Sequence, residues 1–124
     1  MVSDIQKMRQ AEKARLYNLV QEARSKKSLY FAKKQAINNA ITQMQLAEMC
    51  LENAETSLKE NYNGDASDCN DMKNKLQNTQ FTLKAKIRNL ESLISMIDTR
   101  NSQLDSEISD CLTNIDNIIW LENT

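Results

Sequence analysis

Apolar residues recur at every seventh position along this chain, and that spacing constrains its fold more than any other feature. In the second half, one line of the repeat comprises Leu76, Leu83, Leu90, Ile97, Leu104, Cys111 and Ile118. A second line, four residues further on, comprises Ile87, Ile94, Ile108 and Ile115. Apolar groups at this interval lie on one stripe of an α-helix, and such a stripe needs a partner helix to cover it. The repeat therefore predicts pairing between helices and does not suggest a small-molecule pocket.

Asn101 occupies a place in the second line where an isoleucine would fit. A buried Asn fixes the register of paired helices at some cost in stability. An Asn at the edge of the seam would instead contact water. The sequence leaves both interpretations open.

The first half carries its own repeat, which comprises Leu16, Ala23, Tyr30, Ile37, Met44, Leu51 and Leu58. Three residues on from four of these lie Leu19, Ala40, Ala47 and Ala54, which we expect on the same stripe. The three alanines are small enough to let a neighbouring helix approach closely.

The chain contains no proline and a single glycine, Gly64, near its midpoint. Many short elements are implausible, because almost no turn-forming residues are present. A chain of 124 residues also forms one domain at most. We therefore predict a single all-α domain over residues 1–124, an antiparallel two-helix hairpin with long helices at about 2–61 and 66–121 and a turn at about 62–66.

The distribution of charge supports this hairpin. Residues 7–34 carry nine basic and two acidic groups, whereas residues 91–122 carry seven acidic groups and one basic group. Nearer the turn the signs reverse, with Glu48, Glu52 and Glu55 opposite the basic region 73–88. Antiparallel helices bring each block to its opposite, whereas a parallel homodimer would set like against like. The basic cluster at 24–34 could bind phosphates, but we favour a solvated face that forms ion pairs.

Several classes of function are not expected. The chain has no histidine and three cysteines, which a fold-back at Gly64 would hold apart, so we expect free thiols and no metal or cofactor site. Without histidine or a concave pocket, we expect no catalytic residues and no enzyme. The net charge of −1 argues against a nucleic-acid binder. No apolar run reaches about 18 residues, so we expect no membrane insertion, and the charged N-terminus lacks a secretory signal core, which implies cytoplasmic synthesis.

A second group of apolar residues lies off both stripes. Aromatic residues and methionine are enriched at protein interfaces, and a two-helix hairpin cannot cover them itself. We therefore predict a partner-binding surface among them, against the alternative that they are ordinary scattered surface residues. The group comprises Tyr17, Phe31, Met49, Phe81, Leu93, Leu112 and Trp120.

The predicted turn carries a short motif, Tyr62, Gly64 and Ala66 in the pattern aromatic-x-Gly-x-Ala. Between two amphipathic helices, this motif resembles the WXG-type proteins of type VII secretion and the small partners encoded beside LXG-type toxins. The resemblance implies a helical hairpin that pairs with a second hairpin into a four-helix bundle and is exported without a cleaved signal peptide; retention in the cell is equally compatible. Tyr62 replaces the usual tryptophan, and the aromatic-then-acid export mark is missing, since Thr124 lies four residues after Trp120. The resemblance thus implies targeting through a partner that carries the mark.

Three functional hypotheses follow. The first is a non-enzymatic adaptor or targeting chaperone that packs against the N-terminal helices of a type VII secreted, LXG-like effector or against a second small hairpin. The second is a structural coiled-coil subunit that self-associates, for example as a homodimer, without any link to secretion. The third is a membrane-surface helix that uses the basic face of residues 7–34.

Overall fold

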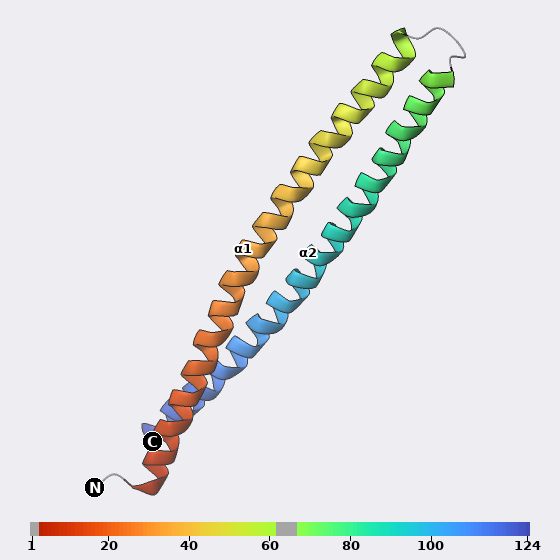
Figure 1. Ribbon diagram of the computed structural model, residues 1–124. Coiled ribbons are helices and arrows are strands. Elements are labelled where there is room, and N and C mark those ends of the chain that lie inside the picture. Colours follow the sequence, from red (N-terminus) through yellow and green to blue (C-terminus); the bar gives the residue numbers. More distant parts are fainter. Residues whose placement is uncertain (1–2, 62–66) are drawn as a thin grey trace. The chain divides into compact units, whose positions relative to one another are not determined.

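The computed structural model describes residues 3–61 and 67–124, and almost all of them belong to two long helices (Figure 1). Helix α1 spans Asp4–Asn61 and helix α2 spans Ser67–Glu122. No strand occurs in this described part of the chain. The predicted all-α class and the predicted helix boundaries are therefore confirmed to within a few residues. The predicted turn motif of Tyr62, Gly64 and Ala66 lies outside the described residues.

Helix α1 begins with a capping box. The Ser3 hydroxyl oxygen accepts a hydrogen bond from the Gln6 backbone N–H at 3.1 Å. The Gln6 side-chain oxygen in turn accepts one from the Ser3 backbone N–H at 3.0 Å. Two backbone donors that a helix start would leave unpaired are thereby satisfied. The N-terminal boundary of α1 is thus encoded locally by the Ser-x-x-Gln pattern.

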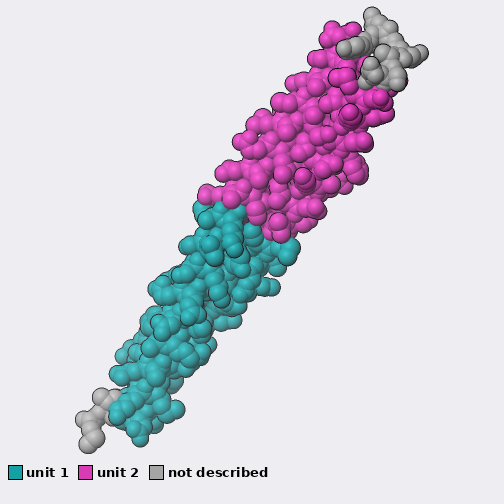
Figure 2. Space-filling view, viewed as in Figure 1, with its two compact units in different colours: residues 1–33, 96–124 teal, residues 34–95 magenta. Residues whose placement is uncertain are grey.

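The chain divides into two compact units, and each unit contains one part of α1 and one part of α2 (Figure 2). Unit 1 comprises Met1–Lys33 and Met96–Thr124, and unit 2 comprises Lys34–Ser95. Segments far apart in the sequence therefore pack together in unit 1, whereas unit 2 is continuous in sequence.

The core of unit 1 consists of five buried side chains. Their exposed fractions are 5% or less, and they are Leu16, Val20, Ala23, Leu104 and Ile115.

Two ion pairs join the helices of unit 1. The Lys13 ammonium lies 2.8 Å from a Glu122 carboxylate oxygen, and Lys27 pairs with Asp105. Moving forward along α1 means moving backward along α2, so the segments are antiparallel. The opposition of a basic block on α1 and an acidic block on α2 is confirmed here.

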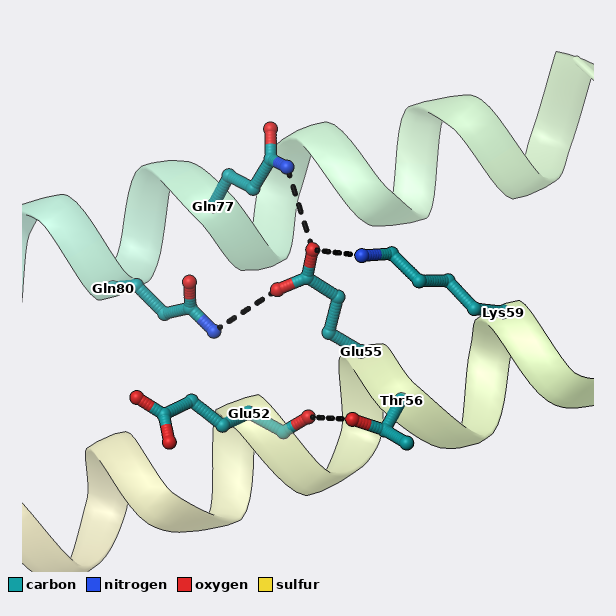
Figure 3. Close-up of polar contacts among 6 residues, drawn as sticks. All are labelled: Glu52, Glu55, Thr56, Lys59, Gln77 and Gln80. Carbon is teal, nitrogen blue, oxygen red and sulfur yellow. Dashed lines mark hydrogen bonds and ion pairs between the residues drawn. The ribbon is translucent and has the colours of Figure 1, made fainter.

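The core of unit 2 is smaller and comprises Ile41, Leu58 and Ile87, each 7–8% exposed. Its polar contacts centre on Glu55, which Figure 3 shows between the two helices. The Gln77 and Gln80 side-chain amides each donate a hydrogen bond to the Glu55 carboxylate at 3.4 Å. Lys59, one turn along α1, lies 3.4 Å from the same carboxylate.

The partners of Glu55 differ in kind from those expected. The charge pattern placed Glu55 opposite lysines and arginine of residues 73–88, whereas its contacts across the helix pair are the amides of Gln77 and Gln80. Glutamines at these two positions lie nearest to Glu55 on α2, so orientation in this part of unit 2 is supported by hydrogen bonds to amides.

One prediction about the seam of α1 is wrong for part of its residues. Four residues were expected on the same stripe, three positions after the repeat that runs from Leu16 to Leu58. Of these, Leu19 is 39% exposed and Ala54 is exposed, whereas Ala40 and Ala47 are half-buried. The structure instead buries Val20 and Ile41, which lie four positions after that line, at 2% and 8% exposure. An antiparallel partner reaches only one side of a helix stripe, and here it covers the side that contains Val20 and Ile41.

Asn101 lies inside the seam of unit 1. Its side-chain oxygen is buried and has no hydrogen-bond partner. The structure therefore does not support the interpretation in which this oxygen contacts water at the edge of the seam. An unpaired buried acceptor costs free energy, so Asn101 weakens the pairing of the helices at this layer.

Candidate protein-binding surface

The seven-residue repeat gives every side chain of the two helices a defined side. We label its positions a to g, with Leu16 and Leu104 at d and with Val20 and Ile115 at a, all four in the core. Positions e and g then flank the seam on opposite sides, and position c lies outside g. The side that carries positions g and c is called the g flank below.

Unit 1 has a groove on its g flank, called groove 1. Leu19, Ala23 and Cys111 supply its apolar or thiol surface, and its volume is about 340 Å³. The remaining lining residues are charged, and they are Glu22, Lys26, Glu107 and Asp110. All seven lining residues occupy positions d, g or c. Groove 1 is therefore the place where the g flanks of α1 and α2 meet in unit 1.

The charged rim of groove 1 is mostly acidic. A Glu107 carboxylate oxygen lies 3.5 Å from the Arg100 guanidinium. Among the residues that the structure describes, neither Glu22 nor Asp110 has an ion-pair partner within 4.0 Å. The rim therefore presents three carboxylates against the single ammonium of Lys26, beside an apolar surface.

Unit 2 has a second groove at the same repeat positions, called groove 2. Its volume is about 330 Å³. It is lined by Ala54, Leu58, Met72, Lys75, Leu76 and Thr79. Lys75 is the single charged group of this lining, so groove 2 is more apolar than groove 1. The small side chain of Ala54 leaves room beside Leu58, which is how the sequence opens the groove.

Exposed apolar side chains lie on the g flank of both units. Sixteen large apolar side chains are exposed in the described residues, and half of them occupy positions g or c. These eight are Ile5, Met8, Leu19, Leu29, Met72, Leu93, Met96 and Leu121. Exposed apolar side chains next to a groove are typical of an interaction surface.

The seven predicted partner-binding residues are all exposed, at 36–70%, but they do not share one face. Leu93 lies on the g flank. Tyr17, Phe31 and Leu112 occupy position e of unit 1, on the other side of its seam. Met49, Phe81 and Trp120 occupy the outward positions b and f. Their role in binding stays a prediction.

Sequence reasoning missed most of the g flank. It did not single out Leu19 or Met72 as exposed, and it assigned Leu19 to the seam. The signal that could have found this flank is the repeat itself, once Val20 is recognised as the inner residue in place of Leu19.

The three cysteines form no disulfide. Cys50 is exposed, and Cys69 and Cys111 are half-buried. Within residues 3–61 and 67–124, no cluster of His, Cys, Asp or Glu side chains has the arrangement of a metal site. Over the same residues, neither helix contains a segment long and apolar enough to cross a membrane.

The fold and surface define a protein of two antiparallel helices in which each unit has a groove on its g flank. Comparison of the chain with protein-family models, with curated proteins and with solved structures gives no match.

Proposed function

We propose that this chain is a non-enzymatic helical adaptor that packs against the N-terminal helices of a type VII secreted, LXG-like effector. The observation that carries the proposal is that each unit has a groove on its g flank, with exposed apolar side chains beside it. The resemblance of the turn to WXG-type proteins supplies the class of partner.

The exposed apolar side chains of each unit support a role that depends on a partner. Unit 1 exposes Leu19 in the lining of groove 1, and unit 2 exposes Met72 in the lining of groove 2. Two further helices packed on the g flank of each unit would cover these side chains and complete a four-helix bundle.

The proposed mechanism is stoichiometric helix packing without chemistry. The partner's apolar stripe is removed from water against grooves 1 and 2, which stabilises both proteins because buried apolar area lowers the free energy of the complex. The adaptor thereby keeps the effector's helices soluble and contributes half of a composite surface for the secretion machinery. Export would depend on a partner that carries the export mark.

Co-expression tests the proposal. The chain is produced together with the product of each gene that neighbours its own, and the purified material is analysed by size-exclusion chromatography with light scattering. We expect a stable complex of defined stoichiometry and a higher melting temperature than for the chain alone. A tight homodimer that ignores the neighbouring protein would contradict the proposal and favour the self-associating coiled-coil subunit.

A matched pair of variants tests the surface. Met72 and Leu46 are both 51% exposed in unit 2, but only Met72 lines a groove. Met72→Lys should weaken the complex at least about tenfold, whereas Leu46→Lys should leave it nearly unchanged. Equal effects of the two substitutions would exclude groove 2 as part of the interface.

A further inference from the structure

We propose that groove 1 receives a partner helix that carries lysine or arginine side chains beside an apolar anchor residue. This inference rests on the proposed adaptor function and specifies the chemistry of the partner at one place. It follows from the shape, the floor and the rim of the groove.

The shape of groove 1 fits a helix. Its α1 side consists of residues 19, 22, 23 and 26, and its α2 side consists of residues 107, 110 and 111. These spacings of three and four form the ridges into which the side chains of another helix pack. A groove between two antiparallel helices is therefore complementary to a helix with apolar residues at the same spacing.

The floor of groove 1 selects an apolar anchor. Ala23 is 5% exposed and small, Leu19 is 39% exposed, and Cys111 is half-buried. A leucine or methionine side chain inserted between Ala23 and Cys111 would cover the exposed part of Leu19. Burial of an aliphatic side chain of this size is a main source of binding energy in such sites.

The rim selects cations. Three of the four charged groups of the rim are acidic, against the single cation Lys26. Glu22 and Asp110 flank the floor from opposite helices and have no ion-pair partner in the described chain. An acidic helix seated on the floor would bring like charges together at both carboxylates. A helix with Lys or Arg on both sides of the stripe that carries its anchor would pair with both. Charge complementarity thus distinguishes the two classes of partner.

Two synthetic helical peptides test the inference. They share one apolar stripe, and the residues that flank it are all lysine in one peptide and all glutamate in the other. The readout is maleimide alkylation of Cys111 in the full-length variant Cys50→Ser/Cys69→Ser, in which Cys111 is the single thiol. We expect the lysine peptide to protect Cys111 and to bind at least about tenfold more tightly than the glutamate peptide. Added salt should reduce the difference in affinity between the two peptides, because salt screens the charges of the rim.

Charge reversal provides the control. Glu22→Lys/Asp110→Lys should invert the preference between the peptides, because it converts the acidic rim to a basic one. Glu52→Lys/Asp116→Lys makes the same change in net charge at exposed positions outside both grooves and should leave the preference intact. Equal binding of both peptides, or a preference that survives the first reversal, would overturn the inference. Protection of Cys111 that depends on protein concentration without any peptide would overturn it in favour of a second copy.

The two proposals fail in different ways. If the encoded neighbour co-purifies equally well with wild type and with Glu22→Lys/Asp110→Lys, the basic-helix inference fails and the adaptor function stands. If the lysine peptide binds as described but no neighbour co-purifies, the adaptor function fails and the groove chemistry stands.

Discussion

At the scale of single residues, Asn101 is the clearest place where the chain gives up stability. Its buried oxygen has no hydrogen-bond partner, and the neighbouring positions of the same line in α2 hold isoleucine, Ile94 and Ile108. A polar group retained inside a helix seam is consistent with a role in fixing the register of the two helices. In any other register, the Asn101 side chain would be buried against different residues of α1.

Replacing Asn101 should therefore stabilise the chain. Asn101→Leu removes an unpaired buried acceptor and adds apolar contact, so we expect the free energy of unfolding to rise by about 1–3 kcal/mol. Urea unfolding followed by circular dichroism measures this change. Asn89→Leu, an exposed position on the same helix, is the control, and an Asn101 variant that is no more stable than the control would contradict this account.

Glu55 makes stability depend on pH. Desolvation raises the pKa of its carboxyl group, but hydrogen bonds from Gln77 and Lys59, the Lys59 charge and a hydrogen bond from Gln80 together outweigh it, so the pKa lies below its ordinary value. A depressed pKa in the folded state stabilises the fold above the ordinary Glu pKa, about 4.3, and this stabilisation is lost as pH falls through the lowered value.

Removal of the Glu55 charge should therefore matter only above that pH window. Glu55→Gln is expected to lower the melting temperature at neutral pH, and the gap from wild type should close as the pH falls below the ordinary Glu range. Glu52→Gln, an exposed acid one turn earlier, is the matched control and should show little difference at any pH. A gap that widens in acid would refute the role assigned to Glu55.

At the scale of the helix, α1 shows how an apolar pattern can mislead. The positions three residues after the repeat that runs from Leu16 to Leu58 include Leu19 and three alanines. Of the positions four residues after that repeat, four hold charged residues, namely Lys27, Lys34, Glu48 and Glu55. Counting apolar residues favours the first line, yet all four charged residues are half-buried. Long charged side chains cover the seam with their aliphatic stems while their charged ends stay near water, and Lys27 pairs there with Asp105.

A pair of alanine substitutions distinguishes the two lines. Val20→Ala should cost about 1–3 kcal/mol of stability, because Val20 is 2% exposed and its lost methyl groups leave a cavity. Leu19→Ala should cost less than about 0.5 kcal/mol, because a surface substitution removes little buried area. Chemical denaturation of both variants measures the contrast; a larger loss for Leu19→Ala would show that the other side of α1 faces α2.

At the scale of the whole molecule, the two units differ in how completely they bury their cores. Unit 1 contains Leu104 at 0% exposure and Val20 and Ile115 at 2%, whereas the core residues of unit 2 remain 7–8% exposed. Less complete burial means less hydrophobic stabilisation per side chain. Unit 2 should therefore open more readily by local unfolding.

Hydrogen exchange tests this difference. Backbone amides around Val20 and Leu104 should exchange more slowly than amides around Ile41 and Ile87, as measured by mass spectrometry of the isolated chain. Binding of a partner along groove 2 should reduce the difference in exchange rate between the two units, because a ligand that binds only the folded state suppresses local unfolding of unit 2. Uniform protection along both helices before any partner is added would contradict the unequal burial.

The sequence by itself determined that this chain forms two long helices, where they begin and end, and that they run antiparallel. The two long helices follow from the absence of proline and from the seven-residue repeat. Their antiparallel direction follows from the opposite charge blocks. Only the tertiary structure decided which side of α1 turns inward, that Val20 and not Leu19 is buried, and that grooves 1 and 2 lie on the g flank. The reason is physical: residues on both sides of a stripe are equally helical, and their burial is fixed only when a second helix covers one side.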